Sequence, residues 1–529
     1  MDNGDTTIAA ARYELLRTER DPFLKMGREM ASLTIPGILP PEGARGGAEM
    51  PQPYQSVGAD GVNNLSSKIT LTLFPPGESF FRLTMDDFVL DEMRRKAGDD
   101  EQFERDRSTF EEQLGRIERA VINRMEQRGN RALNFTAAQH LIVTGNGLIQ
   151  VLKDGGEKFH ALDRYVVKRD LSGNVLEIIV KEPLARLALP PAAEAIVAKR
   201  SEKDDPKATE QNVDLYTWVR RVDGGGYKVH QEIDGQLVPG SEGSYPAGKS
   251  AWIPLRWRAI PGEDYGRGHC EEYAGDLRSL ESLQKSIVKF AAAAAKVLFL
   301  VNPQGTTSKR KIAGADSGDI EDGDARDVTV LQMEKFADFR VAHDTKEEIR
   351  KRLEKAFLLT SAVQRDAERV TAEEIRVMVN ELEQGLGGVY TLLGTELQRP
   401  LVVRIMHQMA SAGQLPHLPD NAVAPQIVTG VEGLGRASET QRLDMLVANV
   451  GQLFGPETVA KTFNPRAYMR RKAAGLSLDV GDLVYTEEQA AQMQQQAMLA
   501  QATEKLGPSL IGAMSKGAEQ PQQTPQEGA

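Results

Sequence analysis

Apolar residues in the first part of the chain recur mainly every three or four positions, the spacing that places them on one side of an α-helix. Proline and glycine interrupt this period at 37–53 and at 75–76, where we expect an extended loop and a helix end. A short apolar run at 80–84 is typical of a strand. The pattern predicts helices at 8–33, 61–74, 100–127 and 134–143.

The period changes between about residues 147 and 258, where apolar residues alternate with polar ones or run continuously. Turn signals such as Ser172-Gly173-Asn174 and Asp223-Gly224 separate these runs. A charged helix and loop at 194–205 is inserted among them. The region is therefore predicted to be rich in strands, at 147–152, 165–170, 175–181, 213–221, 226–233 and 251–258.

Long helical periods return after Gly268, beginning with a predicted helix at 271–298. A second helix is predicted to begin at Asp344, because Glu347 completes a capping-box pattern. The stretch between them, 302–342, is irregular and acidic, with one β-like run at 328–331. We expect two helices that carry a compact tip, the second packing through an apolar stripe of Ile349, Leu353, Ala356 and Phe357.

A third helix is predicted to begin at Thr371, where Glu374 completes a second capping box, and to run to about residue 412. Bends are expected at Gly385, Gly387, Gly388 and Pro400. Further helices are predicted at 438–453 and 456–474, and the Gln-, Pro- and Gly-rich end is predicted to be disordered. The predicted fold class is α+β and mostly helical.

One face of the predicted 271–298 helix carries a row of cations, Arg278, Lys285, Lys289 and Lys296. They are 7, 4 and 7 residues apart, so at about 100° per residue they fall within roughly 40° of one another. Apolar residues such as Leu280 and Ile287 fall on the opposite side. Two interpretations stand: a solvated face of an amphipathic helix, or a surface that lines a path for a polyanion.

Composition narrows the class of protein. The 529 residues allow two to four domains, with 40% hydrophobic and 27% charged residues. A net charge of −11 argues against a protein that coats nucleic acid over its whole surface, although local basic stripes remain compatible with it. The single cysteine, Cys270, allows no disulfide framework. The N-terminus does not resemble a signal peptide, and Lys296 interrupts the apolar run 290–301, so we expect a soluble protein without a membrane anchor.

Residues 243–250 fit the phosphate-loop pattern GxxxxGKS, in which Lys249 and Ser250 would bind nucleotide phosphates and Mg²⁺. That chemistry needs a strand before the loop and a helix after it. Here Pro246 lies inside the loop and Pro254 lies in an extended segment behind it. We therefore favour a β-turn over a nucleotide-driven enzyme, and predict no catalytic residues, no metal site and no cofactor.

Several stretches, taken together and in order, resemble the head-to-tail connector, or portal protein, of short-tailed bacteriophages. They extend from about residue 10 to 490 and so cover most of the chain. The matching stretches are SVGADGVNNLSSK at 56–68, LFP at 73–75, YVVKRD at 165–170, GNV at 173–175, DYGR at 264–267, EY at 272–273, GDLRSLE at 275–281, VNP at 301–303, AVQR at 362–365, ERVTAEEIR at 368–376 and GGVY at 387–390.

The resemblance implies a ring, expected to be a dodecamer, that forms a DNA channel at one capsid vertex and is not itself the packaging motor. It also implies names for the regions of the chain. These are a wing or body at 1–269, a stem with helices at 270–300 and 344–359, a clip at 301–343, a channel loop at 360–370, a long wing helix at 371–413, a crown at 414–486 and a flexible tail at 487–529.

Arg365 and Arg369 lie in the expected channel loop and are candidates to face DNA, together with the cations of the 271–298 helix. Pairing with Asp366 and Glu368 is the competing interpretation. Lys309, Arg310 and Lys311 are candidates for docking at the clip. The competing interpretation is that they form a solvated turn. The implied partners are further copies of the chain, double-stranded DNA bound without sequence specificity, terminase, scaffolding and major capsid proteins, tail adaptors and internal core proteins. The implied location is the virion, and the host cytoplasm during assembly.

Overall fold

A computed structural model describes most of the chain, in two compact units, Met1–Leu434 and Gly435–Ala529. The described residues are 8–44, 47–76, 79–85, 87–201, 212–294, 298–316, 318–320, 322–331, 336–359, 382, 385–415, 423–427, 435–455, and 459, 462, 463, 465, 468, 469 and 472.

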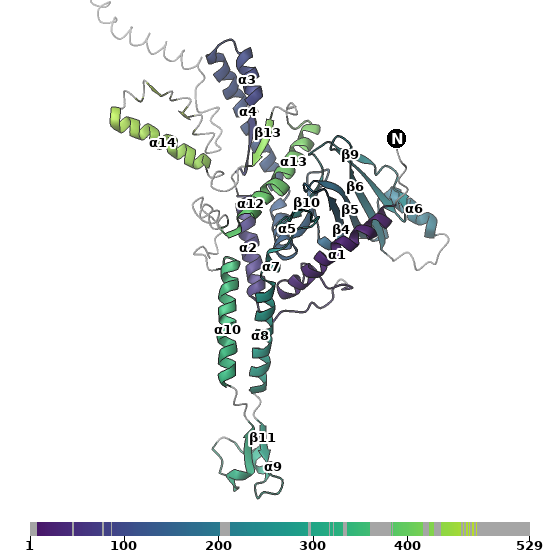
Figure 1. Cartoon of the computed structure of the whole chain (residues 1–529), viewed down its shortest axis with the longest axis vertical. Helices are drawn as coiled ribbons and strands as arrows, with labels where there is room; N and C mark the ends of the chain where they lie inside the picture. The colour runs from purple at the N-terminus through teal and green to yellow at the C-terminus, as the bar shows by residue number, and fades with distance from the viewer. Residues whose placement is uncertain are drawn as a thin grey trace, which may run out of the picture. The chain divides into compact units, whose positions relative to one another are not determined.

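The first unit is α+β and mostly helical, as predicted (Figure 1). Its longer helices are α1 (Ala9–Leu33), α2 (Val57–Leu73), α3 (Asp87–Lys96), α4 (Asp100–Gln127), α5 (Asn130–Thr144), α6 (Pro191–Ser201), α8 (Ala274–Ala294), α10 (Phe336–Ala356) and α13 (Arg399–Ser411). The predicted helix at 100–127 has the predicted bounds, because Asp99 accepts a hydrogen bond from Gln102 N and so caps the first turn.

The largest sheet is antiparallel, in the order β4 (Tyr165–Arg169), β5 (Val175–Leu184), β6 (Val213–Arg221), β7 (Tyr227–Ile233) and β8 (Gln236–Leu237), with β9 (Gly243–Tyr245) also on β7. Val166, Ile179 and Trp218 pair in register on one face and pack against α1. Val167 and Ile178 face the main core instead. Both faces of the central strands are therefore buried, which explains their nearly continuous apolar sequence.

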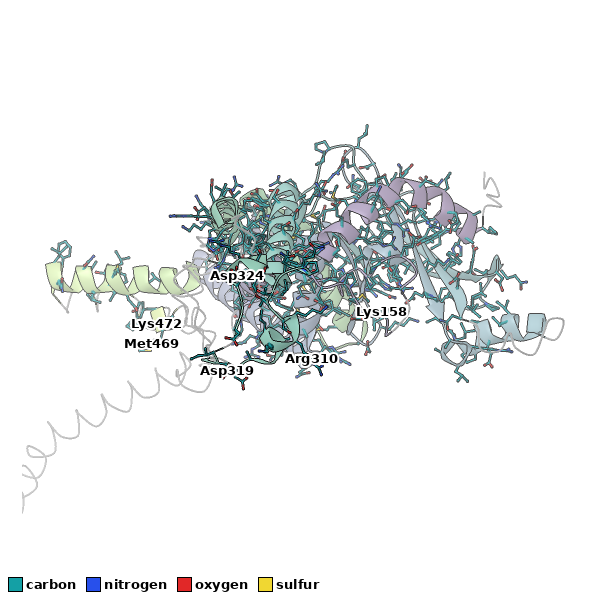
Figure 2. All side chains as sticks on the ribbon, turned by 90° about the horizontal axis from the view of Figure 1, so that it is seen from below. Lys158, Arg310, Asp319, Asp324, Met469 and Lys472 are labelled. Atoms are coloured by element: carbon teal, nitrogen blue, oxygen red, sulfur yellow. The ribbon has the colours of Figure 1, made fainter. Side chains whose placement is uncertain are left out.

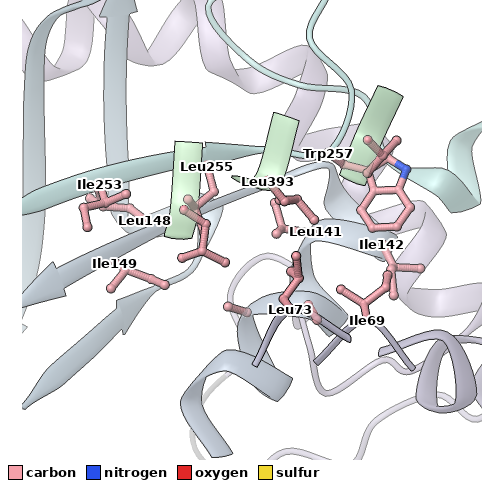
Figure 3. Packing of buried hydrophobic residues seen from close by; sticks show 14 of the residues in the cluster. Ile69, Leu73, Leu141, Ile142, Leu148, Ile149, Ile253, Leu255, Trp257 and Leu393 are labelled. Carbon is pink, nitrogen blue, oxygen red and sulfur yellow. The ribbon is translucent and has the colours of Figure 1, made fainter. Parts of the chain in front are cut away.

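A second sheet, β10 (Trp252–Arg256), β2 (Asn146–Val151) and β3 (Glu157–His160), lies in the main core beside α2 and α5. Figure 3 shows Ile69 and Leu73 of α2 pointing toward Leu141 and Ile142 of α5. All four side chains are at most 2% exposed. Burial of a side chain of this size contributes about 2 kcal/mol, so this cluster fixes α2 within the body.

The two helices α8 and α10 lie side by side (Figure 1), as predicted for a helical pair. The chain between them forms β11 (Leu298–Val301), α9 (Lys309–Gly314) and β12 (Val328–Leu331), of which the two strands pair antiparallel. The predicted β-like run at 328–331 is thus confirmed. In the second unit, α14 (Gly435–Phe454) holds Asp444, which accepts hydrogen bonds from Tyr468 Oη and, at 3.0 Å, from Lys472 Nζ.

Several predicted boundaries were wrong. The helix expected at 271–298 is broken at Tyr273, after the short α7 (His269–Glu272), and ends at Ala294, so that Leu298 lies in a strand. The second helix begins at Phe336, which places Asp344 in its interior and not at its cap. At the first break, His269 and Cys270 of α7 are buried in the body, a long-range contact that the local pattern of the sequence does not encode.

Of the third predicted helix, residues 371–381, 383 and 384 lie outside the described residues. From Gly388 onward it consists of α12 (Gly388–Leu393), a π-helical turn η5 (Gly394–Gln398) and α13. A break beside the glycines was predicted, and Gly387 takes a φ of +43° before α12. The π-helical turn was not predicted, and neither was β13 (Val423–Ile427), which pairs with β1 (Phe81–Met85).

Candidate nucleic-acid interface

The α8–α10 pair is joined by an apolar seam and an ion pair. Leu277 and Leu280 of α8, and Ile349 and Leu353 of α10, are at most 5% exposed. At the body end of the pair, the Asp276 carboxylate accepts a hydrogen bond of 3.0 Å from Arg352 Nη2. The predicted apolar stripe of the second helix is confirmed, and it turns the remaining faces of both helices outward.

The cationic face of α8 lies on the side away from this seam. Arg278, Lys285 and Lys289 are all exposed, as their spacing predicts. Lys296, the fourth member, lies outside the described residues.

Two of the three described cations contact other parts of the same chain. Arg278 Nε donates to Glu29 Oε1 of α1 at 2.6 Å, and each group shifts the pKa of the other, raising that of Arg278 and lowering that of Glu29. Lys285 Nζ lies 5.8 Å from the centre of the Tyr54 ring, a cation–π contact. The body end of the cationic face is therefore partly covered by the chain itself.

Glu281 of α8 is engaged within its own chain. Its carboxylate accepts hydrogen bonds from Tyr54 N at 2.9 and 3.0 Å and from Gln55 N at 3.3 Å. These bonds hold the segment before α2 on α8. Of the three described cations on this face of α8, the exposed Lys289 lies farthest from the body and is the best placed to meet an external polyanion.

The candidates Arg365 and Arg369 lie outside the described residues, so their orientation stays a prediction. The chain is described up to Leu359, three residues beyond the end of α10. There Phe357 is fully buried, and Ala356 O lies 3.1 Å from His269 Nε2. The point from which the expected channel loop departs is thus anchored in the core.

Lys309, Arg310 and Lys311 form the first turn of α9 and are exposed. The run lies in a short helix and not in a turn, because Ser308 O accepts the backbone bonds that open a helix, from Lys311 N and Ile312 N. Its role, a solvated surface or a docking contact, stays a prediction. Figure 2 shows Arg310, Asp319 and Asp324 around the tip. The tip therefore presents both cations and carboxylates to solvent.

The phosphate-loop look-alike at 243–250 is a strand followed by a turn. Tyr245 ends β9, and Trp252 begins β10 where a nucleotide-binding loop would need a helix N-terminus. The Arg404 guanidinium lies 4.9 Å from the centre of the Tyr245 ring, and its Nη1 donates to Lys249 O at 3.3 Å. The expected β-turn is confirmed, and these contacts bind it to α13.

Three buried histidines and the single cysteine have pKa values shifted by burial. Burial lowers the pKa of His140, His160 and His269 to about 4, and burial raises the pKa of the Cys270 thiol. Within the described ranges, no three His, Cys, Asp or Glu side chains gather as metal ligands would. Among the helices of that part of the chain, none is both long enough and apolar enough to cross a membrane.

Comparison with known proteins identifies the class. A family model described as "Bacteriophage head to tail connecting protein" matches residues 6–483. The chain is 38% identical to a portal protein of Enterobacteria phage T3, over 91% of this chain and 89% of that protein. It is 38% identical to a portal protein of Escherichia phage T7, over 93% and 90% of the two chains. For Enterobacteria phage SP6 the identity is 30%, over 94% and 95%.

The chain therefore belongs to the bacteriophage head-to-tail connecting protein family. Its function is that of a portal protein, a structural part of the virion that joins head to tail. The likeness to the solved "neck of empty GTA particle" is distant, at 12% identity and a TM-score of 0.38 over 77% of this chain and 89% of that chain, and it carries no weight for fold or assembly.

Proposed function

We propose that copies of this chain form a ring, a dodecamer, around a DNA channel at one capsid vertex. The observation that carries this proposal is the α8–α10 pair, whose apolar seam turns a row of exposed cations outward on a member of the portal family. In a ring, each such cation becomes a belt of positive charge. A belt of this kind contacts DNA phosphates without reading sequence.

The regions of the chain then take the following roles in the proposal. Residues 1–269 form the wing, and the helices expected at 270–300 and 344–359 form the stem, observed as α8 and the second half of α10. Residues 301–343 form the clip and 360–370 the channel loop. Residues 371–413 form the long wing helix, 414–486 the crown and 487–529 the tail.

The proposed partners follow from these roles. Terminase during packaging, and the tail adaptor afterwards, dock on the clip, where Lys309, Arg310 and Lys311 supply exposed cations. Scaffolding, major capsid and internal core proteins contact the wing and the crown, and assembly takes place in the host cytoplasm. Arg365 and Arg369 contact DNA from the channel loop, and such phosphate contacts weaken steeply with salt, so that they slow DNA without trapping it.

Two experiments test this proposal. Negative-stain images of the purified protein should show rings with a central hole, and compact particles without a hole would contradict the conduit. The double variant Arg365→Ala, Arg369→Ala should still form rings, yet heads assembled with it should package or retain less DNA. Normal genome-filled heads would remove the two arginines from the proposal.

The competing proposal, a nucleotide-driven enzyme using 243–250, has a direct test. ATP turnover by the purified ring is compared with turnover by a Lys249→Ala variant. Turnover that depends on Lys249 would favour the enzyme, and we expect none.

A further inference from the structure

The carboxyl end of α10 is held by one face of α2. Gly61, Asn64 and Lys68 are spaced three and four residues apart, so they share one side of the helix. All three contact residues 357–358, the turn that follows the last residue of α10, Ala356. We refer to these three residues as the α2 socket. They belong to the stretch at 56–68, to which the portal function gives no role.

Polar groups of the socket donate hydrogen bonds to the carbonyls of the turn that ends α10. Asn64 Nδ2 donates to Phe357 O at 3.1 Å and to Leu358 O at 3.0 Å. Lys68 Nζ donates to Leu358 O at 2.9 Å from a side chain that is only 4% exposed. Carbonyls at a helix C-terminus lack partners within the helix, and a cation there is favoured by the helix dipole. The socket supplies both the donors and the charge.

The third member of the socket acts through its lack of a side chain. A Cβ built on Gly61 would lie 2.5 Å from Cγ of the Phe357 ring, closer than atoms can approach. Phe357 is 0% exposed, and its ring centre lies 5.3 Å from that of His269. Glycine at position 61 therefore lets the ring enter the core between α2 and α7.

The turn that the socket holds is strained. Leu359 N bonds Glu354 O at 2.8 Å and Leu358 N bonds Lys355 O at 3.2 Å, the two bonds of a Schellman motif. Such a motif usually has glycine at the left-handed position, but here Leu358 occupies it with a φ of +54°. A left-handed leucine persists only where its surroundings impose it. The socket bonds to the carbonyls of 357 and 358 supply that constraint.

We propose that Gly61, Asn64 and Lys68 are positioning residues, which fix the direction in which the chain leaves α10 and thereby couple the body to the segment that begins at residue 360. This inference rests on the proposed function, in which that segment faces DNA. Ile69 and Leu73 pack α2 into the main core. Through the socket, the position of this core therefore determines the direction in which the chain leaves α10.

The test compares full-length rings carrying Lys68→Met, which keeps length but removes the donor, with Lys68→Arg, which restores a cationic donor. Ser67→Ala, at an exposed neighbour in α2, is the matched control. Hydrogen exchange is measured for a peptide covering 353–359, ring formation by negative stain, and DNA retention as nuclease-protected genome per head.

For Lys68→Met we expect intact rings, exchange at Leu358 and Leu359 faster by about tenfold, the factor for one lost hydrogen bond, and less protected DNA. Lys68→Arg should restore both, and Ser67→Ala should change neither. Unchanged exchange in Lys68→Met would show that the socket does not hold the turn at 358–359. Faster exchange with full DNA retention would overturn its positioning role.

A second variant covers the case in which Lys68→Met does not assemble. Asn64→Ala leaves the Lys68 bond in place and should give the same two effects more weakly; if it gives neither, the proposal is overturned. Failure of the proposed channel role would be distinct, because heads with Arg365→Ala and Arg369→Ala would then stay full while the exchange result at 358–359 remained.

Discussion

Glu396 of the π-helical turn binds Arg256 of β10 through both carboxylate oxygens. Oε1 accepts from Arg256 Nε at 3.0 Å and Nη2 at 2.5 Å, and Oε2 accepts from the backbone N at 3.1 Å. Arg169 Nη1 of β4 lies 3.8 Å from the same Oε1. The Glu396 carboxylate therefore joins the segment α12–η5–α13 to both sheets, and the π-helical turn η5 places it between them.

Replacing this carboxylate should destabilise the subunit strongly. The side chains of Glu396 and Arg256 are 15% and 9% exposed, so Glu396→Ala would leave the largely buried Arg256 without its anion and remove one of the two carboxylates near Arg169. We expect a loss of about 3–5 kcal/mol. Glu396→Gln keeps acceptor atoms and should lose less. Thermal unfolding of the purified variants measures both, and equal stability of Glu396→Ala and wild type would contradict the role given to the pair.

Glu157 should make the protein less stable at alkaline pH. Its Oε1 accepts from Asn130 Nδ2, but its Oε2 is shielded from solvent and has no partner among the described residues. Burial raises the pKa of Glu157 to about 8, above its usual value of 4.5. The folded state thus holds a proton that the unfolded chain releases. The stability that this proton contributes is fully present below about pH 4.5 and is lost as the pH rises through 8.

Glu157→Gln should therefore raise stability at pH 8, by up to about 4 kcal/mol, and change it little at pH 4. Glutamine keeps an acceptor for Asn130 and carries no charge at either pH. Unfolding midpoints of variant and wild type across pH 4–9 give the comparison. A gain of equal size at both ends of the range would show that charge is not the cause.

Buried histidines should produce the opposite trend in acid. Burial lowers the pKa of His140 to about 4, below its usual 6.5, and His140 Nδ1 is buried without a partner among the described residues. The unfolded chain takes up a proton near pH 6.5 that the folded chain resists. Stability from this group is complete above pH 6.5 and falls as pH drops toward 4.

His140→Phe should reduce the loss of stability between pH 7 and pH 4.5 by about 2 kcal/mol. Phenylalanine keeps an aromatic ring beside Phe159, whose ring centre lies 4.6 Å from that of His140. Denaturant unfolding at the two pH values gives the difference for each protein. A variant as acid-sensitive as the wild type would assign the acid response to other groups, such as His160 and His269.

The cationic face of α8 predicts a graded effect on DNA. Lys289 is exposed, whereas Arg278 is bound to Glu29, so Lys289→Glu should reduce DNA-filled heads by about tenfold through repulsion of phosphates. Arg278→Ala should have a smaller effect. Lys228→Glu, an equal charge change on β7, is the control for net charge. Equal loss in Lys228→Glu and Lys289→Glu would show that position on α8 does not matter.

Local pattern was sufficient for most elements of the fold. The helix at 100–127 and the strand at 213–221 have the bounds that their periodicity predicts, because amphipathic period and end signals lie within each segment. Pro246 and Pro254 were likewise enough to reject the phosphate loop. Two of the boundaries that failed, at Asp344 and Leu298, are places where the chain passes between the helical pair and the tip; the third, at Tyr273, lies at the body end of the pair.

In the candidate site, too, some features follow from local sequence pattern and others from tertiary packing. By itself, the sequence determined that Arg278, Lys285 and Lys289 share an exposed face, since helical spacing fixes which residues lie together on one helix. Only the tertiary structure decided that Glu29 holds Arg278 and that Tyr54 meets Lys285, and these partners lie more than two hundred positions away. Likewise, the sequence contains Gly61, Asn64 and Lys68, but their role depends on the end of α10 being packed against them. Spacing along a helix is a local property, whereas a side chain's partner depends on the packing of distant segments.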